Sequence, residues 1–234
     1  LAADGASFPL AEDLLNGYES LNPHTLLTLT HGSRPSALAA LEAGEVDAAL
    51  LLYPLEGDDL FHTPVAREMI VLIAHPDVPV DGLTRRDVRA LFSGQIAAWP
   101  APTGEEGQPV QVVTREGGSS TRLAFEALLM GGQPHAASAR LASDEGHLLQ
   151  LVSETPGAVG YTTRSALGEG VKVLDYEASA PTPQNARTNA YPLVTLVEFV
   201  ASGEPEGTLR DLLDWVLSDD GQAVVRRHML GLSD

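Results

Sequence analysis

The chain has 234 residues, of which 44% are hydrophobic, and it contains no cysteine. This length suits one large domain or two smaller ones, and the apolar content is enough for a packed core without disulfides or cysteine-bound zinc. A formal net charge of −18 argues against a nucleic-acid partner and against steering of an anion by the overall field, so an anion site would need local, oriented donors. No uncharged apolar run is long enough to span a membrane.

The N-terminal part of the chain alternates strands and helices. A short strand is expected to end at Asp4, and the helix that follows carries Pro9 in its first turn, where the missing N–H costs nothing. The buried stripe of this helix is predicted at Leu10, Leu14, Tyr18 and Leu21. A nearly continuous apolar run at 47–53 suits a strand that is buried on both faces. Further elements are expected as strands at 25–31 and 69–74 and a helix at 37–43.

The C-terminal part continues this alternation. Thr84 and Thr208 are each expected to cap a helix, and segments 132–143 and 178–189 have the composition of loops, the first with a short helix. Other elements are expected as strands at 110–113, 157–163, 171–174 and 191–201 and helices at 119–130, 144–152 and from 220 onward. The buried side of the helix at 119–130 is predicted at Leu123, Ala127, Leu128 and Met130. Repeated strand-helix units predict an α/β fold with a mostly parallel sheet, in which ligands bind beyond the carboxyl ends of the strands.

The stretch 110–132 has the make-up of an anion-binding turn. Its strand ends at Arg115, which supplies a permanent charge and a planar donor fork, and the glycines at 117 and 118 allow a tight turn. Hydroxyls and backbone N–H groups at a helix start, where the helix dipole attracts anions, come from Ser119, Ser120 and Thr121. The pattern indicates half of an oxyanion cradle, and an ordinary strand-turn-helix corner with a solvated arginine explains it about as well.

Two other glycine-serine turns, at 5–7 and 32–33, also follow a predicted strand and open a helix. Together with the turn at 118–119 they could bring their hydroxyls to one small anion. Three unrelated helix caps are the competing explanation.

These segments, in their order along the chain, resemble the phosphate-binding proteins of high-affinity phosphate ABC transporters, within the type II periplasmic binding protein superfamily. The family's first loop, G-A-T-F-P, is matched by GASFP at 5–9, and its R-x-x-G-S-G-T loop is matched by REGGSST at 115–121. Other matching segments are the Gly-Ser pair at 32–33, 88–99, GAVGY at 157–161, YPL at 191–193 and SDDGQ at 218–222. The resemblance covers nearly the whole chain.

The resemblance implies an α/β fold of two lobes with a ligand cleft between them. Lobe one would comprise 1–70 and 190–234, lobe two 71–180, and 181–189 would form a connection on the hinge side. Carried over by position, the oxyanion ligands would be Ser7, Phe8, Ser33, Arg115, Ser119, Ser120 and Thr121. No catalytic residue, metal or cofactor is implied.

By the same likeness, the protein would be an extracytoplasmic solute-binding protein, in the periplasm or at the cell surface. It would capture inorganic phosphate or a similar tetrahedral oxyanion as a monomer and deliver it to the permease of an ABC transporter. A lipid anchor in a full-length precursor is compatible with this expectation.

The chain departs from the family pattern at several positions. Leu52 stands where phosphate binders carry an aspartate that accepts the ligand's proton, and Gly117 stands where a second acidic residue steadies the arginine. Glu116 is adjacent and could substitute for that residue, Ser120 replaces a glycine, and Arg34 occupies a position that is often small. A site with donors only would favour a fully ionised oxyanion, so the sequence predicts either a phosphate binder of altered selectivity or a binder of another oxyanion.

Two other function classes compete with this reading. An enzyme would need a nucleophile or metal site, but Ser119 lies in no G-x-S-x-G elbow and the seven histidines have no metal-ligand spacing. A sensor or interaction domain that kept the fold and changed or lost its ligand would account for Leu52 and Gly117. The acidic pairs Asp58-Asp59 and Glu105-Glu106 are expected to be solvated rather than metal-binding.

Overall fold

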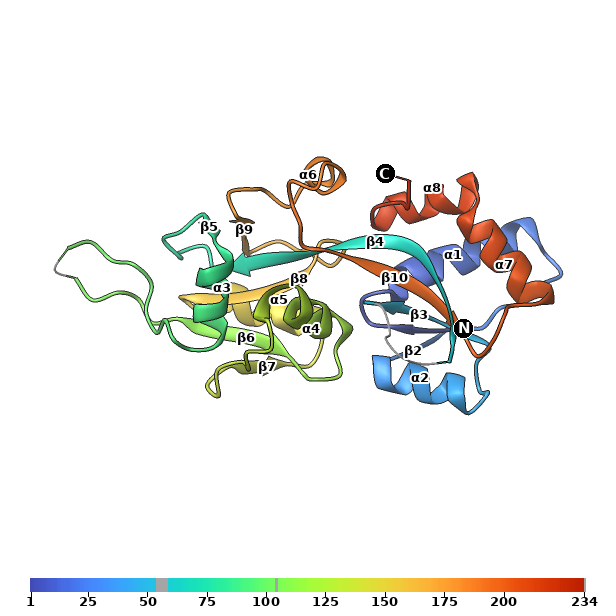
Figure 1. Ribbon diagram of the computed structural model, residues 1–234, viewed down its shortest axis with the longest axis horizontal. Coiled ribbons are helices and arrows are strands. Elements are labelled where there is room, and N and C mark those ends of the chain that lie inside the picture. The colour runs from blue at the N-terminus through green and yellow to red at the C-terminus, as the bar shows by residue number, and fades with distance from the viewer. Residues whose placement is uncertain (54–58, 104, 234) are drawn as a thin grey trace. The chain divides into compact units, whose positions relative to one another are not determined.

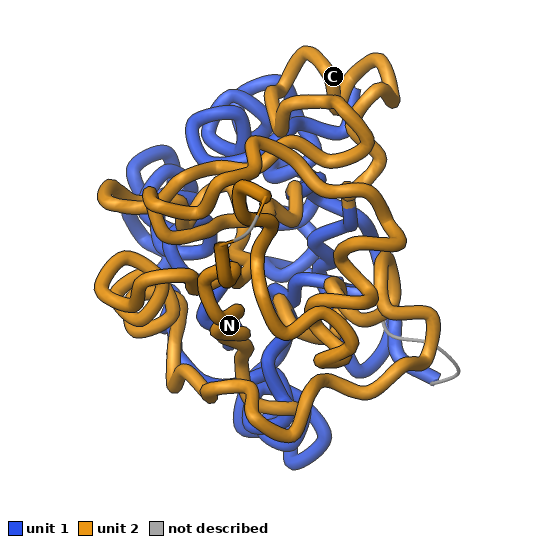
Figure 2. The backbone as a smooth tube through the Cα atoms, turned by 90° about the vertical axis from the view of Figure 1, so that its left-hand side faces the viewer, with its two compact units in different colours: residues 1–68, 118–120, 195–234 blue, residues 69–117, 121–194 orange. Residues whose placement is uncertain are grey.

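The computed structural model describes residues 1–53, 59–103 and 105–233, so Asp58 of the first acidic pair lies outside the described residues. The chain divides into two compact units, coloured separately in Figure 2. Unit 1 comprises residues 1–68, 118–120 and 195–234, and unit 2 comprises 69–117 and 121–194. Two strands, β4 (Phe61–Ala74) and β10 (Val194–Ala201), begin in one unit and end in the other. Whether these units correspond to the two lobes expected from the sequence stays a prediction.

Unit 1 is built on a sheet whose strand order is β2-β1-β3-β10. Strand β1 pairs in parallel with both β2 and β3, whereas β10 runs antiparallel to β3. Helices α1, α7 and α8 cover one face of this sheet and α2 covers the other (Figure 1). The elements are β1 (Ala2–Asp4), α1 (Phe8–Leu21), β2 (Thr30–Gly32), α2 (Arg34–Glu42), β3 (Ala48–Leu52), α7 (Gly207–Leu217) and α8 (Asp219–His228).

Most expected elements of unit 1 are present with shifts at their ends, but the strand expected at 25–31 is reduced to β2 at 30–32. The stripe of α1 is buried as predicted at Leu10, Leu14 and Tyr18, but Leu21 is 61% exposed because the helix ends there. Helix α2 begins three residues before the expected start, because Ser33 caps it and Pro35 is tolerated in a first turn. Thr208 lies inside α7, whose cap is Glu206.

Unit 2 contains a mixed sheet in the order β4-β8-β6-β7. Strand β6 is parallel to both β8 and β7, while β4 is antiparallel to β8 and β9, so the expectation of a mostly parallel sheet is too simple. Helix α5 packs against β6, β7 and β8. The remaining elements are β5 (Gly82–Leu83), α3 (Arg85–Phe92), β6 (Gln111–Arg115), α4 (Ser120–Phe125), β7 (Arg140–Ala142), α5 (Glu145–Glu154), β8 (Ala158–Thr163), β9 (Lys172–Tyr176) and α6 (Pro183–Arg187).

The helix after β6 differs most from the prediction. Its second half is a π-helical turn, η1 (Glu126–Met130), which takes one more residue per turn than an α-helix. The buried face therefore passes from Ala124 and Phe125 to Leu129 and Met130, and Ala127 is exposed. Strand β7 and helix α6 were also not predicted, because both lie in segments with loop composition. Within the described parts of the chain, no helix has the length and apolar character to cross a membrane.

We predict that Gly221→Ala destabilises unit 1. A Cβ at this position in α8 would lie 2.2 Å from the Trp215 carbonyl oxygen and 2.6 Å from the Cα of Val216, and these backbone atoms of α7 cannot move cheaply. The expected loss is about 1–3 kcal/mol of unfolding free energy, measured by denaturant titration. Gly203→Ala is the matched control, because no atom lies within 4 Å of its added Cβ. Equal stability of the two variants would contradict the close approach of α7 and α8.

Candidate functional site

The three glycine-serine turns all open helices. Ser7 is the N-cap residue of α1, Ser33 is the N-cap residue of α2, and Ser120 is the first residue of α4. The Ser33 hydroxyl accepts a hydrogen bond from the backbone N of Ser36 at 3.3 Å, whereas the Ser7 side chain makes no capping bond. Because the first N–H groups of a helix have no acceptor within it, each turn presents backbone donors.

In unit 1, donors from three separate segments converge on the buried carboxylate of Asp4, which is 2% exposed. Its Oδ1 accepts from the backbone N of Ser7 at 2.9 Å, and its Oδ2 accepts from the backbone N of Leu52 at 2.9 Å and from the Ser120 hydroxyl. Burial raises the pKa of Asp4 above its usual value, and these hydrogen bonds oppose that rise. Asp4 thus ties the start of α1, the end of β3 and the turn at 118–120 to the end of β1.

The Ser7 hydroxyl is fully buried and, among the described residues, completes no hydrogen bond of good geometry. It lies close enough to the Asp4 carboxylate to favour that group's ionised form. A buried hydroxyl without a partner loses roughly 1–3 kcal/mol relative to a hydrogen-bonded one. Ser7 is therefore a donor in need of an acceptor at the N-terminus of α1.

The other expected ligands of unit 1 differ in burial and in their contacts. Phe8 is half-buried, with its ring edge-on to that of His31 at 4.8 Å between centroids. Ser33 is exposed and donates to Ser36 Oγ at 3.1 Å, whereas Ser119 is only 6% exposed. Gly118 packs against Pro35, to which an added Cβ would approach within 3.1 Å. The structure therefore brings Ser7 and Ser120 to one carboxylate, and the Ser33 hydroxyl is engaged with its own helix.

Leu52 and Arg34, two positions at which the chain differs from the expected family pattern, have structural roles. The Leu52 side chain is fully buried in β3, and the residue contributes only its backbone to the Asp4 cluster. Arg34 is 6% exposed, and its Nη1 donates to the carbonyl oxygens of Leu52 and Tyr53, both at 2.6 Å. Arg34 thus holds the carboxyl end of β3 in place.

In unit 2, a second carboxylate gathers the remaining expected ligands. Glu145 Oε1 accepts from Arg115 Nη1 at 2.7 Å and from the Thr121 hydroxyl at 2.6 Å, and its Oε2 accepts from the Thr162 hydroxyl at 2.9 Å. Burial raises the pKa of Glu145, and the nearby Arg115 charge opposes that rise. Arg115 and Thr121 are therefore fixed by one residue at the start of α5.

Arg115 is 8% exposed, which excludes the solvated arginine of the alternative explanation. Its Nε and Nη2 donate to the two oxygens of Glu116, each at 3.1 Å, so Glu116 steadies the arginine as expected. Nη2 also donates to the carbonyl oxygen of Ser143 at 3.3 Å. The guanidinium is held in one orientation by two carboxylates and a carbonyl group.

Sequence reasoning missed Asp4 and Glu145, the two residues that organise these clusters. Asp4 had a local signal, since it ends a strand immediately before a glycine-serine turn. Glu145 had none, because it lies 30 residues from Arg115 and opens a helix like many surface glutamates.

Comparison with known proteins gives consistent matches over most of the chain. The PBP superfamily domain matches residues 1–220. The phosphate-binding protein PstS of Bacillus subtilis is 24% identical over 230 residues, which cover 95% of this chain and 76% of that protein. PstS of Pseudomonas aeruginosa is 30% identical over 192 residues, which cover 69% of this chain and 57% of that protein.

Solved structures share the fold. A provisionally assigned phosphate ABC transporter substrate-binding protein from Clostridium perfringens, solved with bound phosphate, has a TM-score of 0.89 at 22% identity and 99% coverage of both chains. An ABC-type phosphate transport receptor from Vibrio cholerae has a TM-score of 0.82, also at 22% identity and 99% coverage of both. The Synechocystis CcmR regulatory domain, in complex with 2-PG, has a TM-score of 0.66 at 15% identity, covering 97% of this chain and 95% of that one.

We predict a pH dependence for Asp4→Asn. Because burial raises the pKa of Asp4 above 3.8, the folded protein holds this proton more tightly than the unfolded chain. That contribution to stability is complete below the ordinary carboxyl pKa and is lost as pH rises through the raised value. The free energy of unfolding of the parent protein minus that of Asp4→Asn should therefore fall as pH rises toward neutrality, in denaturant titrations at a series of pH values.

Asp87→Asn is a control for which the stability difference should change with pH in the opposite direction. Hydrogen bonds from Thr84 lower the pKa of Asp87, so its contribution is present above the ordinary pKa and lost on acidification. A stability difference for Asp4→Asn that grows with pH would contradict a pKa of Asp4 raised by burial.

Proposed function

The chain belongs to the PBP superfamily, whose domain matches residues 1–220, and from this membership we propose that it captures inorganic phosphate for uptake by an ABC transporter. Its relatives in Bacillus subtilis and Pseudomonas aeruginosa are named phosphate-binding proteins. It is accordingly a binding protein and not an enzyme. The finer assignment, to phosphate and to transport, rests on the chemistry of the two carboxylate-centred clusters.

The proposed ligands are the seven residues expected from the sequence: Ser7, Phe8, Ser33, Arg115, Ser119, Ser120 and Thr121. Hydrogen bonds to a charged group contribute roughly 1.5–3 kcal/mol each, so several are needed to offset the desolvation of a phosphate. Arg115 is already oriented by Glu116 and Glu145, so little side-chain entropy is lost when it binds. The same carboxylates balance its charge, so selectivity comes from directed bonds rather than from excess positive charge.

The observation that carries this proposal is the buried Ser7 hydroxyl, which completes no hydrogen bond of good geometry among the described residues. It stands at the N-terminus of α1, where the helix dipole favours an anion. An oxyanion oxygen would accept from this hydroxyl and from the unpaired backbone N–H groups of the first turn. A purely structural turn would have no use for a buried, unsatisfied donor.

Phosphate is favoured over sulfate because Asp4 supplies the acceptor that Leu52 cannot. A carboxylate has about four lone-pair sites, and three donors reach Asp4 with good geometry: the backbone N of Ser7, the backbone N of Leu52 and the Ser120 hydroxyl. The Ser7 hydroxyl also lies beside this carboxylate, and in this proposal it donates to the bound oxyanion instead. The remaining site can accept the O–H of monohydrogen phosphate, which sulfate lacks at neutral pH. We therefore assign to Asp4 the selective role expected from an acid at position 52.

Delivery to a permease and an extracytoplasmic location are part of the same proposal. The Vibrio cholerae structure of the same fold is described as an ABC-type phosphate transport receptor. A protein with that role would meet its ligand outside the cytoplasm and would hand it over as a monomer.

We predict that phosphate, and not sulfate, raises the melting temperature of protein freed of ligand by unfolding and refolding. Phosphate at about a hundred times its dissociation constant should add ~2.7 kcal/mol of stability.

Ser7→Ala should weaken phosphate binding roughly tenfold or more in calorimetric titration, because a bond to a charged group is lost. Asp4→Asn should weaken phosphate binding more than sulfate binding, so the ratio of the phosphate affinity to the sulfate affinity should fall.

Ser20→Ala is the matched control, since its hydroxyl bonds the Gly17 carbonyl oxygen on the exposed side of the same helix. It should bind phosphate like the parent protein. A shift of equal size with sulfate would disprove the role of Asp4. The absence of a shift with any oxyanion would disprove phosphate capture and favour a sensor or interaction domain.

A further inference from the structure

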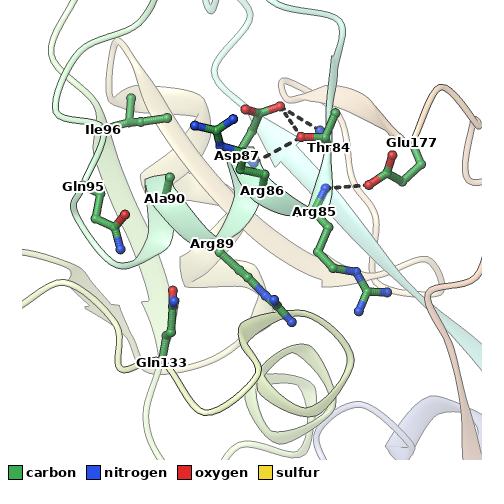
Figure 3. A pocket seen from close by; sticks show the side chains of 10 residues that line it. All are labelled: Thr84, Arg85, Arg86, Asp87, Arg89, Ala90, Gln95, Ile96, Gln133 and Glu177. Carbon is green, nitrogen blue, oxygen red and sulfur yellow. Dashed lines mark hydrogen bonds between the residues drawn. The ribbon is translucent and has the colours of Figure 1, made fainter.

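A cavity of about 750 Å³ runs along helix α3 in unit 2, and three arginines of this one helix line it: Arg85, Arg86 and Arg89 (Figure 3). The chain has only 14 lysines and arginines against 32 aspartates and glutamates. A concentration of three positive charges on one short helix is therefore unexpected from composition. We refer to this cavity and its three arginines as the α3 groove.

No carboxylate of the described residues pairs with these three guanidinium groups within 4.0 Å, whereas Arg122 pairs with Glu126 at 2.7 Å. The two acidic residues of the groove are engaged otherwise. Asp87 accepts from the backbone N and hydroxyl of Thr84, and Glu177 accepts from the backbone N of Arg85. These bonds leave both carboxylates charged, and Asp87 interacts electrostatically with Arg86. The lining of the groove therefore holds three arginines against two carboxylates, an excess of positive charge in a strongly acidic chain.

Two of the arginines are held in place by bonds that use only Nε. Arg85 Nε donates to the Tyr176 hydroxyl at 3.1 Å, and Arg89 Nε donates to the Leu129 carbonyl oxygen at 2.6 Å. Both side chains project from the same side of α3, as Figure 3 shows. Their terminal Nη groups thus form two ordered donor forks, and such forks suit carboxylates because each can make two parallel hydrogen bonds.

This arrangement is unfavourable for the helix itself. Arg85 and Arg86 stand in the first turn of α3, where the helix dipole repels positive charge. Arg85 and Arg89 are four residues apart, a spacing at which like charges repel each other. Asp87 in the first turn and Arg89 in the last turn offset part of this cost. An anionic partner bound at Arg85 and Arg89 would relieve the repulsion that remains between them.

The spacing of the forks indicates what they recognise. An α-helix rises about 6 Å over four residues, so the backbone positions of Arg85 and Arg89 lie about 6 Å apart along the axis of α3. Alternate side chains of an extended peptide are about 6.8 Å apart and point the same way. A segment with acidic residues at alternate positions would therefore place one carboxylate at each fork. A flat anionic bilayer could not enter such a groove, and the net charge of −18 would repel it at longer range.

We propose that the α3 groove is a docking surface for an acidic, extended peptide segment of a partner protein, with its carboxylates bound by Arg85 and Arg89. This inference is independent of oxyanion capture, because it concerns different residues and a different ligand class.

The test is fluorescence anisotropy with two labelled hexapeptides, Glu-Thr-Glu-Thr-Glu-Thr and its Gln-Thr counterpart, added to the full chain. The acidic peptide should bind, the neutral one should not, and binding should weaken as salt rises. Arg85→Gln should weaken binding by about tenfold, because one bidentate pair is lost. Arg85→Lys should recover only part of this loss, since it restores the charge without the fork. Arg85 is replaced rather than Arg89, because the Nε of Arg85 bonds a side-chain hydroxyl, that of Tyr176, whereas the Nε of Arg89 bonds a backbone carbonyl oxygen, that of Leu129.

Arg164→Gln is the matched control, because it removes the same charge from an exposed position of unit 2. It should leave acidic-peptide binding within about twofold of the parent, as expected for a screened surface charge. Failure of the acidic peptide to bind would overturn the proposal, as would an equal loss in Arg164→Gln. Binding of phosphatidylserine vesicles that Arg85→Gln abolishes would also overturn it, by reassigning the groove to a membrane surface.

Discussion

A buried carboxylate has to be surrounded by donors, and this requirement organises much of unit 1. Asp4 meets it with the backbone N of Ser7, the backbone N of Leu52 and the Ser120 hydroxyl, which come from three separate parts of the sequence. Leaving any of these donors or the carboxylate unpaired in the interior would be costly. The start of α1, the end of β3 and the turn at 118–120 are therefore positioned together, and the expected anion ligands of this unit are positioned with them.

Glu145 applies the same constraint in unit 2. It orients Arg115 and Thr121 with one carboxylate, and Glu116 completes the fixation of the guanidinium. One of the boundaries between the units falls at the peptide bond between Ser120 and Thr121, so the Ser120 hydroxyl belongs to the Asp4 cluster and the Thr121 hydroxyl to the Glu145 cluster. Two neighbouring residues of one short motif are thus hydrogen-bonded to different buried carboxylates. An alanine or glycine at either acid would disturb several of the predicted ligands at once, although neither acid belongs to the predicted ligand set.

Sequence patterns predicted what is local and missed what is long-range. Apolar runs and caps located β3, β8, α1 and α3, because burial periodicity and N-cap chemistry act over a few residues. Strand β7 and helix α6 were missed, since pairing with β6 and a single cap stabilise segments of loop composition. The proposed hydroxyl and arginine ligands come from a local motif. Asp4 and Glu145 were not predicted, because their importance comes from burial beside residues distant in sequence.

The position of β10 also bears on how the protein is made. One of the two neighbours of β3 in the unit 1 sheet is the strand of residues 194–201, so Leu52 finds its partner Val197 only after most of the chain exists. Unit 2 contains no residue beyond 194 and lacks this delay. During synthesis from the N-terminus, unit 2 can fold first, while β3 keeps an exposed edge until the last segment emerges. Removal of residues 194–234 should therefore destabilise residues 1–68 more than unit 2.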